Sequence, residues 1–589
     1  MKRLGEAAAA VRARPGLGAV VALGIAWGLV IHSMGWAQLG HFAQVRAFAD
    51  GTAEIDRYHW ETNDKGYVDG HFYSVKSPGV AGLSLPLYVA VRAAGGEDLA
   101  RDAAANARDT AHPRWEPRTI VPLENYRYDY ELGRQVEGQV EWETPLVWIL
   151  TLLVAVFPAV LLLLGVRWAA DRIEPGYGTA AAVTLGLCTI VLTFAAEYFS
   201  HVISAALGFG AFLLLWRERE GPPSRRLVAL AGLMAGLAVT FEFQVGLVGV
   251  ILFIYALSRA DDRLGRALAY GAGAVAGALP MLAFNTWAFG NPFKLAYGYA
   301  VDEPGLTGHD VLGLNSDGFF GINAPSLHSA GELLLANRGL LVLTPIVVMA
   351  VVGVILMRRR GPRAEANVIL AVAAAYFIYN AGYWLPMGGG TPGPRFLIPA
   401  LPFVAIGLAS AYRRFPALTL GLAIPSAVFM LIGSLTFPLL GGQGTGVWWQ
   451  FLTEGQLEHT LPTALGVSNA WLAVAPVLAA VAAAIVLAYR ATPRTPVHDL
   501  VPAFAGVIAW AGISVVGPSI ARVANEDDIP LSGGEDAVKL VALGVAISMA
   551  TLSVLALRAR LTQRPPEAAP APALGSAGAR EPALGERTR

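Results

Sequence analysis

The residues best suited to chemistry are concentrated in residues 55–79, close to the N-terminus. This stretch holds carboxylates, imidazoles, aromatic rings and a lysine, namely Asp56, His59, Asp64, His71, Tyr73 and Lys76. Ionisable side chains that crowd together in this way are typical of sites that move protons or bind charged ligands. The other interpretation is a solvated loop whose charges pair with one another.

Lys76 stands directly before Ser77-Pro78-Gly79 and an apolar stretch, residues 80–94. A cation held beside the N-terminus of a helix at a membrane surface is a good anion site. The anion most natural at that place is the phosphate of a lipid carrier. Alternatively, Lys76 extends along the protein surface to the lipid headgroups.

Arg395 follows a loop rich in glycine and proline, residues 388–394, and precedes another apolar segment. The planar guanidinium suits phosphate. The alternative is a structural pair with Glu197 or Glu242, because a charge close to the membrane usually has a partner. These glutamates and His201 fall at the ends of apolar segments, where they could line a polar cavity or pack through hydrogen bonds. His41 lies three residues before Gln44, so both can face one side of a helix.

The elements that position these residues must be membrane helices. The chain is 55% hydrophobic and 15% charged, whereas soluble domains carry about 25% charged residues. Its apolar residues form blocks of roughly 20, the length that crosses ~30 Å of hydrocarbon. We therefore predict an all-α polytopic membrane protein with about fourteen spans. The predicted spans are 16–38, 144–167, 176–196, 201–217, 226–241, 242–258, 265–288, 337–357, 364–384, 395–413, 416–438, 469–490, 499–518 and 537–557.

Arginines predict which side each loop faces. They cluster in alternate connections, and positively charged loops stay in the cytoplasm, so both termini are predicted to be cytoplasmic. This orientation holds only if residues 80–94, with Pro86, lie at the outer interface and do not cross. Residues 39–143 then form one outer loop with interfacial helices.

The predicted organisation has four parts: a cytoplasmic N-terminus (1–15), a transmembrane catalytic module (16–440), C-terminal helices (441–557) and a disordered cytoplasmic tail (558–589). The preference for arginine over lysine and the many Ala, Gly and Pro residues are typical of bacteria with GC-rich genomes, so the cytoplasmic membrane is the predicted location. No P-loop, HExxH motif or cysteine-based metal set occurs, and no cofactor, metal or nucleic acid is predicted.

Three segments resemble a known superfamily. Residues 70–79, GHFYSVKSPG, resemble the first outer loop of the GT-C membrane glycosyltransferases, in the aminoarabinose transferase (family 39) and protein O-mannosyltransferase branches. Residues 393–403, GPRFLIPALPF, are similar to a segment of the same branches, and residues 284–293, FNTWAFGNPF, are similar to actinobacterial members. The resemblance extends over residues 16–440.

The resemblance implies transfer of a sugar, with inversion, from a polyprenyl-phosphate donor to a glycan, lipid or protein acceptor on the outer face. Lys76 and Arg395 match the positions that bind the donor phosphate. The family's acidic base falls near Gln38, which cannot take a proton, so Asp56, then Asp64, or else His41 must serve. His59, His71, Tyr73, Glu197, His201 and Glu242 are expected in the substrate cavity. The alternative functions are a lipid-linked saccharide transporter or flippase, or a polysaccharide polymerase or ligase.

Overall fold

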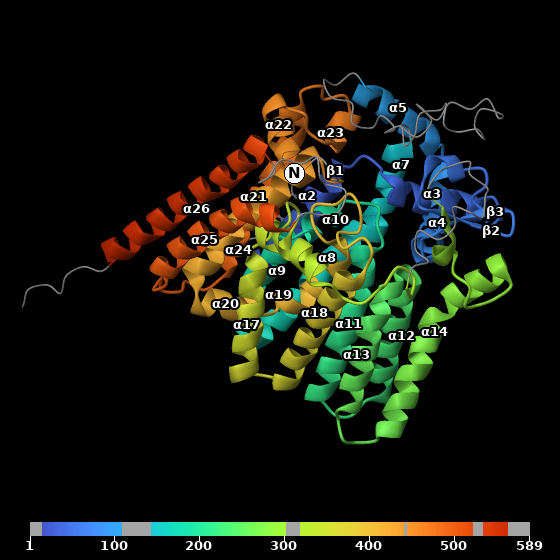
Figure 1. Ribbon diagram of the computed structural model, residues 1–589, viewed down its shortest axis with the longest axis horizontal. Coiled ribbons are helices and arrows are strands. Elements are labelled where there is room, and N and C mark those ends of the chain that lie inside the picture. The colour runs from blue at the N-terminus through green and yellow to red at the C-terminus, as the bar shows by residue number, and fades with distance from the viewer. Residues whose placement is uncertain (1–13, 109–142, 302–317, 441–443, 522–533, 563–589) are drawn as a thin grey trace, which may run out of the picture.

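The computed structural model describes residues 14–108, 143–301, 318–440, 444–521 and 534–562, and most of these are helical (Figure 1). Among them, seven helices are long and apolar enough to cross a membrane, or up to nine if each of two bent pairs is one span. The predicted helical, multi-pass membrane fold is therefore confirmed, but the count of fourteen spans is not. The seven are α7–η3–α8 (Glu143–Ile173), α14 (Arg263–Phe289), α18 (Arg363–Gly382), α21 (Pro416–Thr436), α24 (Ala470–Ala491), α25 (Leu500–Ile520) and α26 (Gly534–Thr562).

Bends and breaks in the backbone account for the lower count. One bent pair turns by 88° between α15 (Leu327–Leu335) with α16 (Leu340–Leu343) and the following α17 (Ile346–Arg360). The other turns by 56° between η7 (Arg395–Ala400) with α19 (Leu401–Ala405) and the following α20 (Leu408–Arg414). Two further predicted spans become short helices. The first helix, α2 (Pro15–Leu29), ends where the chain enters strand β1 (Val30–Ile31). Extended backbone at Thr189 separates α9 (Gly178–Cys188) from α10 (Val191–Phe194).

Small residues let two neighbouring helices pack closely against each other. A helix α12 (Arg225–Phe241) lies against α14, and a Cβ added at Gly232 or Gly236 would come within 2.1 Å of a carbonyl oxygen of α14. Such close backbone contact is how membrane helices associate without a hydrophobic driving force. At Glu242 the backbone becomes extended, and the chain re-enters helix as η4 (Phe243–Val245) and α13 (Gly246–Leu257).

The described part of the predicted outer loop, residues 39–108, packs near the ends of α12–α14 (Figure 1), and residues 109–142 lie outside the described residues. Its elements are α3 (Trp36–Ala49), η1 (His59–Glu61), strands β2 (Lys65–Val68) and β3 (His71–Ser74), α4 (Gly79–Ala93) and α5 (Gly96–Arg108). The apolar stretch expected at the interface is thus a helix of 15 residues with Pro86 inside, too short to cross ~30 Å unaided.

Strands β2 and β3 form a hairpin that the sequence analysis did not predict. Its turn, Asp69-Gly70, has φ of 51° and 94°, as a type I′ turn requires at both central residues. The register pairs Lys65 with Ser74 at one end and Val68 with His71 at the other. Strand β4 (Ala300–Val301), after η5 (Ala296–Tyr299), extends the sheet in the order β3-β2-β4.

The C-terminal part of the chain joins the first helix through a second, two-stranded sheet. Strand β5 (His459–Thr460) pairs antiparallel with β1, and α24 packs on α2. The remaining helices are α11 (His201–Glu220), α22 (Gly446–Glu454) and α23 (Leu461–Ala464). The boundaries of the predicted four parts stay predictions, and residues 563–589 of the predicted tail lie outside the described residues.

Candidate functional site

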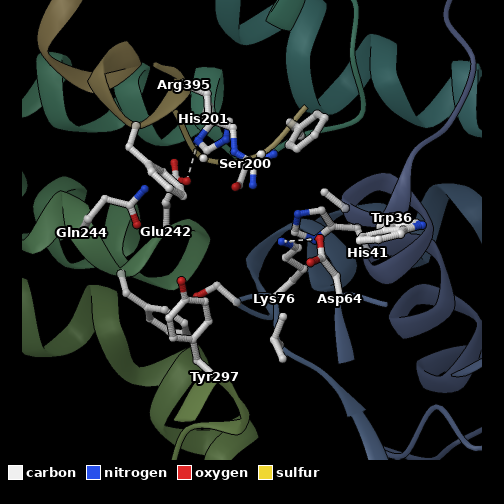
Figure 2. A pocket seen from close by; sticks show the side chains of 18 of the residues that line it. Trp36, His41, Asp64, Lys76, Ser200, His201, Glu242, Gln244, Tyr297 and Arg395 are labelled. Carbon is white, nitrogen blue, oxygen red and sulfur yellow. Dashed lines mark ion pairs between the residues drawn. The ribbon is translucent and has the colours of Figure 1, made fainter. Parts of the chain in front are cut away.

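A cavity of about 1110 Å³ lies between the hairpin and the ends of the neighbouring helices (Figure 2). It exceeds the roughly 300–1,000 Å³ of typical small-molecule sites. Its lining side chains with polar or ionisable groups include Gln38, His41, Glu61, Asp64, Lys76, His201, Glu242, Gln244 and Arg395. Lys76 and Arg395, the two predicted phosphate-binding residues, therefore line the same cavity.

Lys76 and Asp64 form an ion pair at the base of the hairpin. The Nζ of Lys76 lies 2.7 Å from Oδ2 of Asp64, and their side chains are 18% and 27% exposed. The strand register explains this proximity, because the amide of Val75 donates to the carbonyl of Asp64 directly beyond the last strand pair. The hairpin thus places a cation and a carboxylate side by side at the cavity wall.

His41 projects from α3 into the cavity and is 1% exposed. Neither ring nitrogen has a hydrogen-bond partner among the described residues. Burial, together with the positive charges of Lys76 and Arg395, lowers the pKa of His41 well below its usual 6.5. At neutral pH the imidazole is therefore uncharged, with one nitrogen that can donate and one that can accept a hydrogen bond.

Gln38 lies one turn before His41 in α3 and also lines the cavity. Its Nε2 donates to Oε2 of Glu197 at 2.5 Å, and its Oε1 accepts from the amide of Gly35 at 3.0 Å. Glu197 is buried behind this amide and is not among the residues that line the cavity. Gln38 therefore ties the start of α3 to the side chain of Glu197.

Arg395 approaches the cavity from the opposite side (Figure 2). The loop before it turns sharply, since Gly388, Gly389 and Gly393 have φ of 79°, 97° and 131°, values that only glycine adopts without strain. The guanidinium carbon lies 5.4 Å from the ring centre of Phe199 and 5.2 Å from that of Phe396. Within the described part of the chain, Arg395 has no carboxylate partner, and its Nε has no hydrogen-bond acceptor.

The alternative of a structural pair between Arg395 and Glu242 or Glu197 is therefore wrong. Oε1 of Glu242 lies 2.5 Å from Nδ1 of His201. Its Oε2 accepts from the hydroxyl of Ser204 at 2.9 Å. With Glu242 held by His201 and Ser204 and Glu197 held by Gln38, neither carboxylate pairs with Arg395 in the described part of the chain.

Besides Glu197, four predicted site residues lie outside the cavity lining. Asp56 accepts from the amide of Phe72 and pairs with His71 at 2.7 Å, and the two side chains are 40% and 53% exposed. His59 is fully buried and stacked on Phe72, with ring centres 4.0 Å apart. Tyr73 donates to the carbonyl of Ala288. Of the two predicted bases, Asp64 borders the cavity and Asp56 does not, and which of them takes a proton stays a prediction.

An aromatic wall, which the sequence analysis missed, completes the cavity. It consists of Tyr297, Phe319, Phe320, Tyr379, Tyr383, Trp384 and Phe396. The rings of Tyr379 and Tyr383 are stacked at 5.8 Å, and the hydroxyl of Tyr383 contacts that of Tyr297. Tyr383 also meets Phe396 edge-on at 5.2 Å, so the wall is continuous with the residue next to Arg395. The cluster of Tyr379, Tyr383 and the adjacent Trp384 was a local signal, whereas the rings of Tyr297, Phe319, Phe320 and Phe396 come from other parts of the sequence.

Glu61 also lines the cavity and was not among the predicted site residues. Its carboxylate contacts the guanidinium of Arg46, which also pairs with Glu143 at 2.6 Å. The guanidinium of Arg46 lies over the rings of Phe42 and Tyr58 as well. This buried network satisfies the charge of Glu61, so its contribution is to hold α3 against η1 and α7.

The chain was compared with protein families, curated proteins and solved structures. It matches no family model and no curated protein. Similar solved structures include the crystal structures of ArnT from Cupriavidus metallidurans, one in the apo state and one bound to undecaprenyl phosphate. The bound form is 14% identical with a TM-score of 0.40, and the alignment covers 90% of this chain and 87% of that chain. The apo form is 15% identical with a TM-score of 0.42, covering 91% and 88%. Since these scores are low, function must be argued from the residues of the cavity.

Proposed function

We propose that the chain is an integral membrane glycosyltransferase. It transfers a sugar from a polyprenyl-phosphate donor to an acceptor on the outer face of the cytoplasmic membrane, with both termini cytoplasmic. The observation that carries the proposal is the cavity in which Arg395, which has no carboxylate partner among the described residues, faces Lys76 and Asp64. Basic groups for a phosphate and a carboxylate for a proton are the two requirements of this chemistry.

In the proposed reaction, Lys76 and Arg395 bind the donor phosphate. An acceptor hydroxyl attacks the anomeric carbon, its oxygen forms the new glycosidic bond, and its proton passes to the carboxylate of Asp64. The bond between the anomeric carbon and the phosphate oxygen breaks, and its electron pair leaves with the phosphate. A single displacement of this kind inverts the anomeric configuration. The neutral imidazole of His41 can orient the hydroxyl through a hydrogen bond.

The size and walls of the cavity also support a saccharide substrate. A volume of about 1110 Å³ accommodates more than one sugar ring. The aromatic wall offers flat apolar surfaces to the C–H faces of sugars, and its tyrosine hydroxyls offer hydrogen bonds. The rings continue from Phe396 beside Arg395 to Trp384, which is 43% exposed. Sugars can therefore lie along the wall while the phosphate stays at the basic residues.

The decisive experiment measures covalent transfer. Membranes that contain the full-length chain are incubated with a panel of radiolabelled polyprenyl-phosphate monosaccharides, and label in the cell-envelope fraction is counted. Arg395→Ala is expected to lower transfer about 100-fold or more, as the loss of one preorganised charge does elsewhere. Arg57→Ala is the matched control, because Arg57 is 71% exposed and pairs with Asp50 away from the cavity. Equal transfer by Arg395→Ala and the unmodified chain would contradict the proposal. Movement of donor across the membrane without a covalent product would identify a transporter instead.

A further inference from the structure

The two basic residues of the cavity differ in one respect that bears on catalysis. Arg395 has no carboxylate partner among the described residues, whereas Lys76 is engaged by Asp64 at 2.7 Å. The residue assigned to the donor phosphate is thus held by the residue assigned to the acceptor proton. While the ion pair persists, Lys76 is less available to a phosphate and Asp64 is less available to a proton.

A phosphate and the carboxylate of Asp64 are both anions and repel one another at close range. The phosphate can reach Lys76 closely only if Asp64 gives up its contact with the ammonium group. Arg395 is already available on the opposite wall and can receive the phosphate first. The exchange at Lys76 replaces one ion pair by another, so its electrostatic cost is small compared with breaking a pair outright.

We propose that Asp64 and the donor phosphate compete for Lys76, so that donor binding releases Asp64 to act as the base. The inference rests on the proposed function and adds a regulatory step to it. The carboxylate is masked by Lys76 until a donor is in place, which couples proton abstraction to the presence of a sugar ready for transfer. His41 does not substitute for Lys76 as a partner, because its imidazole is uncharged at neutral pH.

Competition predicts opposite effects of one substitution on binding and on turnover. Asp64→Asn removes the competing charge while keeping the size of the side chain, so it is expected to lower the Kd for a lipid phosphate by about tenfold. The same variant loses the base and therefore loses transfer. A residue that merely supports the fold would weaken both.

The test uses the full-length chain in nanodiscs and undecaprenyl phosphate as the probe, with Kd measured by titration of intrinsic tryptophan fluorescence. Asp56→Asn is the matched control: it makes the same change in the same loop, at a carboxylate that also pairs at 2.7 Å but lies outside the cavity lining. It is expected to leave the Kd within about twofold. Lys76→Ala is expected to weaken binding, and Asp64→Asn should tighten binding much less in the Lys76→Ala background than alone, because the two residues act as one pair. Asp64→Ser provides a second variant if the melting temperature shows that Asp64→Asn does not fold.

The outcomes separate this inference from the proposed function. If Lys76→Ala and Arg395→Ala weaken binding but Asp64→Asn leaves it unchanged or weaker, competition is refuted and the phosphate site stands. If Lys76→Ala and Arg395→Ala leave the Kd unchanged, the phosphate site itself is refuted. If Asp64→Asn lowers the Kd by the same factor with and without Lys76, competition is also refuted, because the gain in affinity would then have another source.

Discussion

The two ends of the β2–β3 hairpin carry ion pairs of equal length in different surroundings. At the base, Asp64 and Lys76 are 2.7 Å apart and border the cavity. At the tip, Asp56 and His71 are also 2.7 Å apart, but about half of each side chain is exposed to solvent. The contact distance therefore does not distinguish them. What differs is that other elements, carrying His41 and Arg395, close over the base and not over the tip.

This comparison shows how a surface loop gains a function. Exposed ion pairs contribute little to stability, about 0–1 kcal/mol, and substitution at the tip should be tolerated. At the base the same kind of pair is less exposed, at 18% and 27%, and borders the cavity, so under the proposed function it acts on catalysis.

The largest expected effect is at the base. Lys76→Ala should reduce transfer by about 100-fold or more, because the leaving phosphate loses a charge that stabilises it. His71→Ala, which removes the cation of the tip, should change transfer by less than about twofold. Initial rates with radiolabelled polyprenyl-phosphate donors measure both. A comparable loss in the two variants would mean that the hairpin as a whole, and not its base, supports the reaction.

The next largest effect is expected from substituting glycines at the two ends of the hairpin, Gly66 near the base and Gly70 at the tip. A Cβ at Gly66 would lie 2.6 Å from the carbonyl oxygen of Ala296, so Gly66→Ala forces β2 away from η5. Overpacking of this kind costs about 1–3 kcal/mol, and we expect transfer to fall about tenfold as the base moves. Gly70 has no atom within 4 Å of its Cβ position and a φ of 94°, so Gly70→Ala should cost only about 1 kcal/mol of turn strain.

These two variants are compared by melting temperature in detergent and by transfer rate. Gly70→Ala should show a small decrease in melting temperature with transfer retained. Retained transfer in Gly66→Ala, or lost transfer in Gly70→Ala, would show that the hairpin does not set the position of Lys76.

A subtler difference concerns protonation. The hydrogen bond to Asp56 raises the pKa of His71 above 6.5, whereas burial and then the charge of Lys76 lower the pKa of His41 well below 6.5. As the pH falls from 8, His71 should gain its proton first, and His41 should stay neutral at pH 6.5. Histidine resonances of ¹³C-labelled protein, assigned with His41→Asn and His71→Asn, measure the midpoints. The reverse order of titration would contradict the burial of His41 beside two cations.

The smallest effect is expected for Asp56→Asn. Its carboxylate receives the amide of Phe72 and pairs with His71 at an exposed position, so transfer should change by less than about twofold. A loss as large as that of Lys76→Ala would restore Asp56 as the base and would require the tip to approach the cavity during the reaction.

Part of this site could be predicted from the sequence. Residue type and the apolar segments placed Lys76, Arg395 and His41 near one surface, and the structure brings all three to one cavity. The Asp69-Gly70 dipeptide was an available but unused signal for a hairpin. Once the hairpin is recognised, its register places Asp64 beside Lys76 and sends Asp56 towards the tip.

Other features had no local signal. The freedom of Arg395 depends on where Glu242 and Glu197 find partners, namely on His201, Ser204 and Gln38, and such pairings are set by packing between distant helices. The predicted count of fourteen spans is not confirmed, in part because hydropathy does not register backbone breaks. Thr189 adopts extended backbone within apolar sequence and divides what reads as a continuous hydrophobic segment.

The short β1–β5 sheet has a consequence for how the chain could be divided. All residues that line the cavity fall between 33 and 439, so the C-terminal helices supply none of its described surface. Yet Glu458, beside β5, accepts a hydrogen bond from the amide of Ser33 at 3.2 Å, and Ser33 is the first residue of the lining. If the chain were expressed as two fragments split after residue 440, activity would depend on whether β5 still joins β1. The C-terminal fragment would then serve as an assembly partner, and its recovery with the first fragment could be followed separately from catalysis.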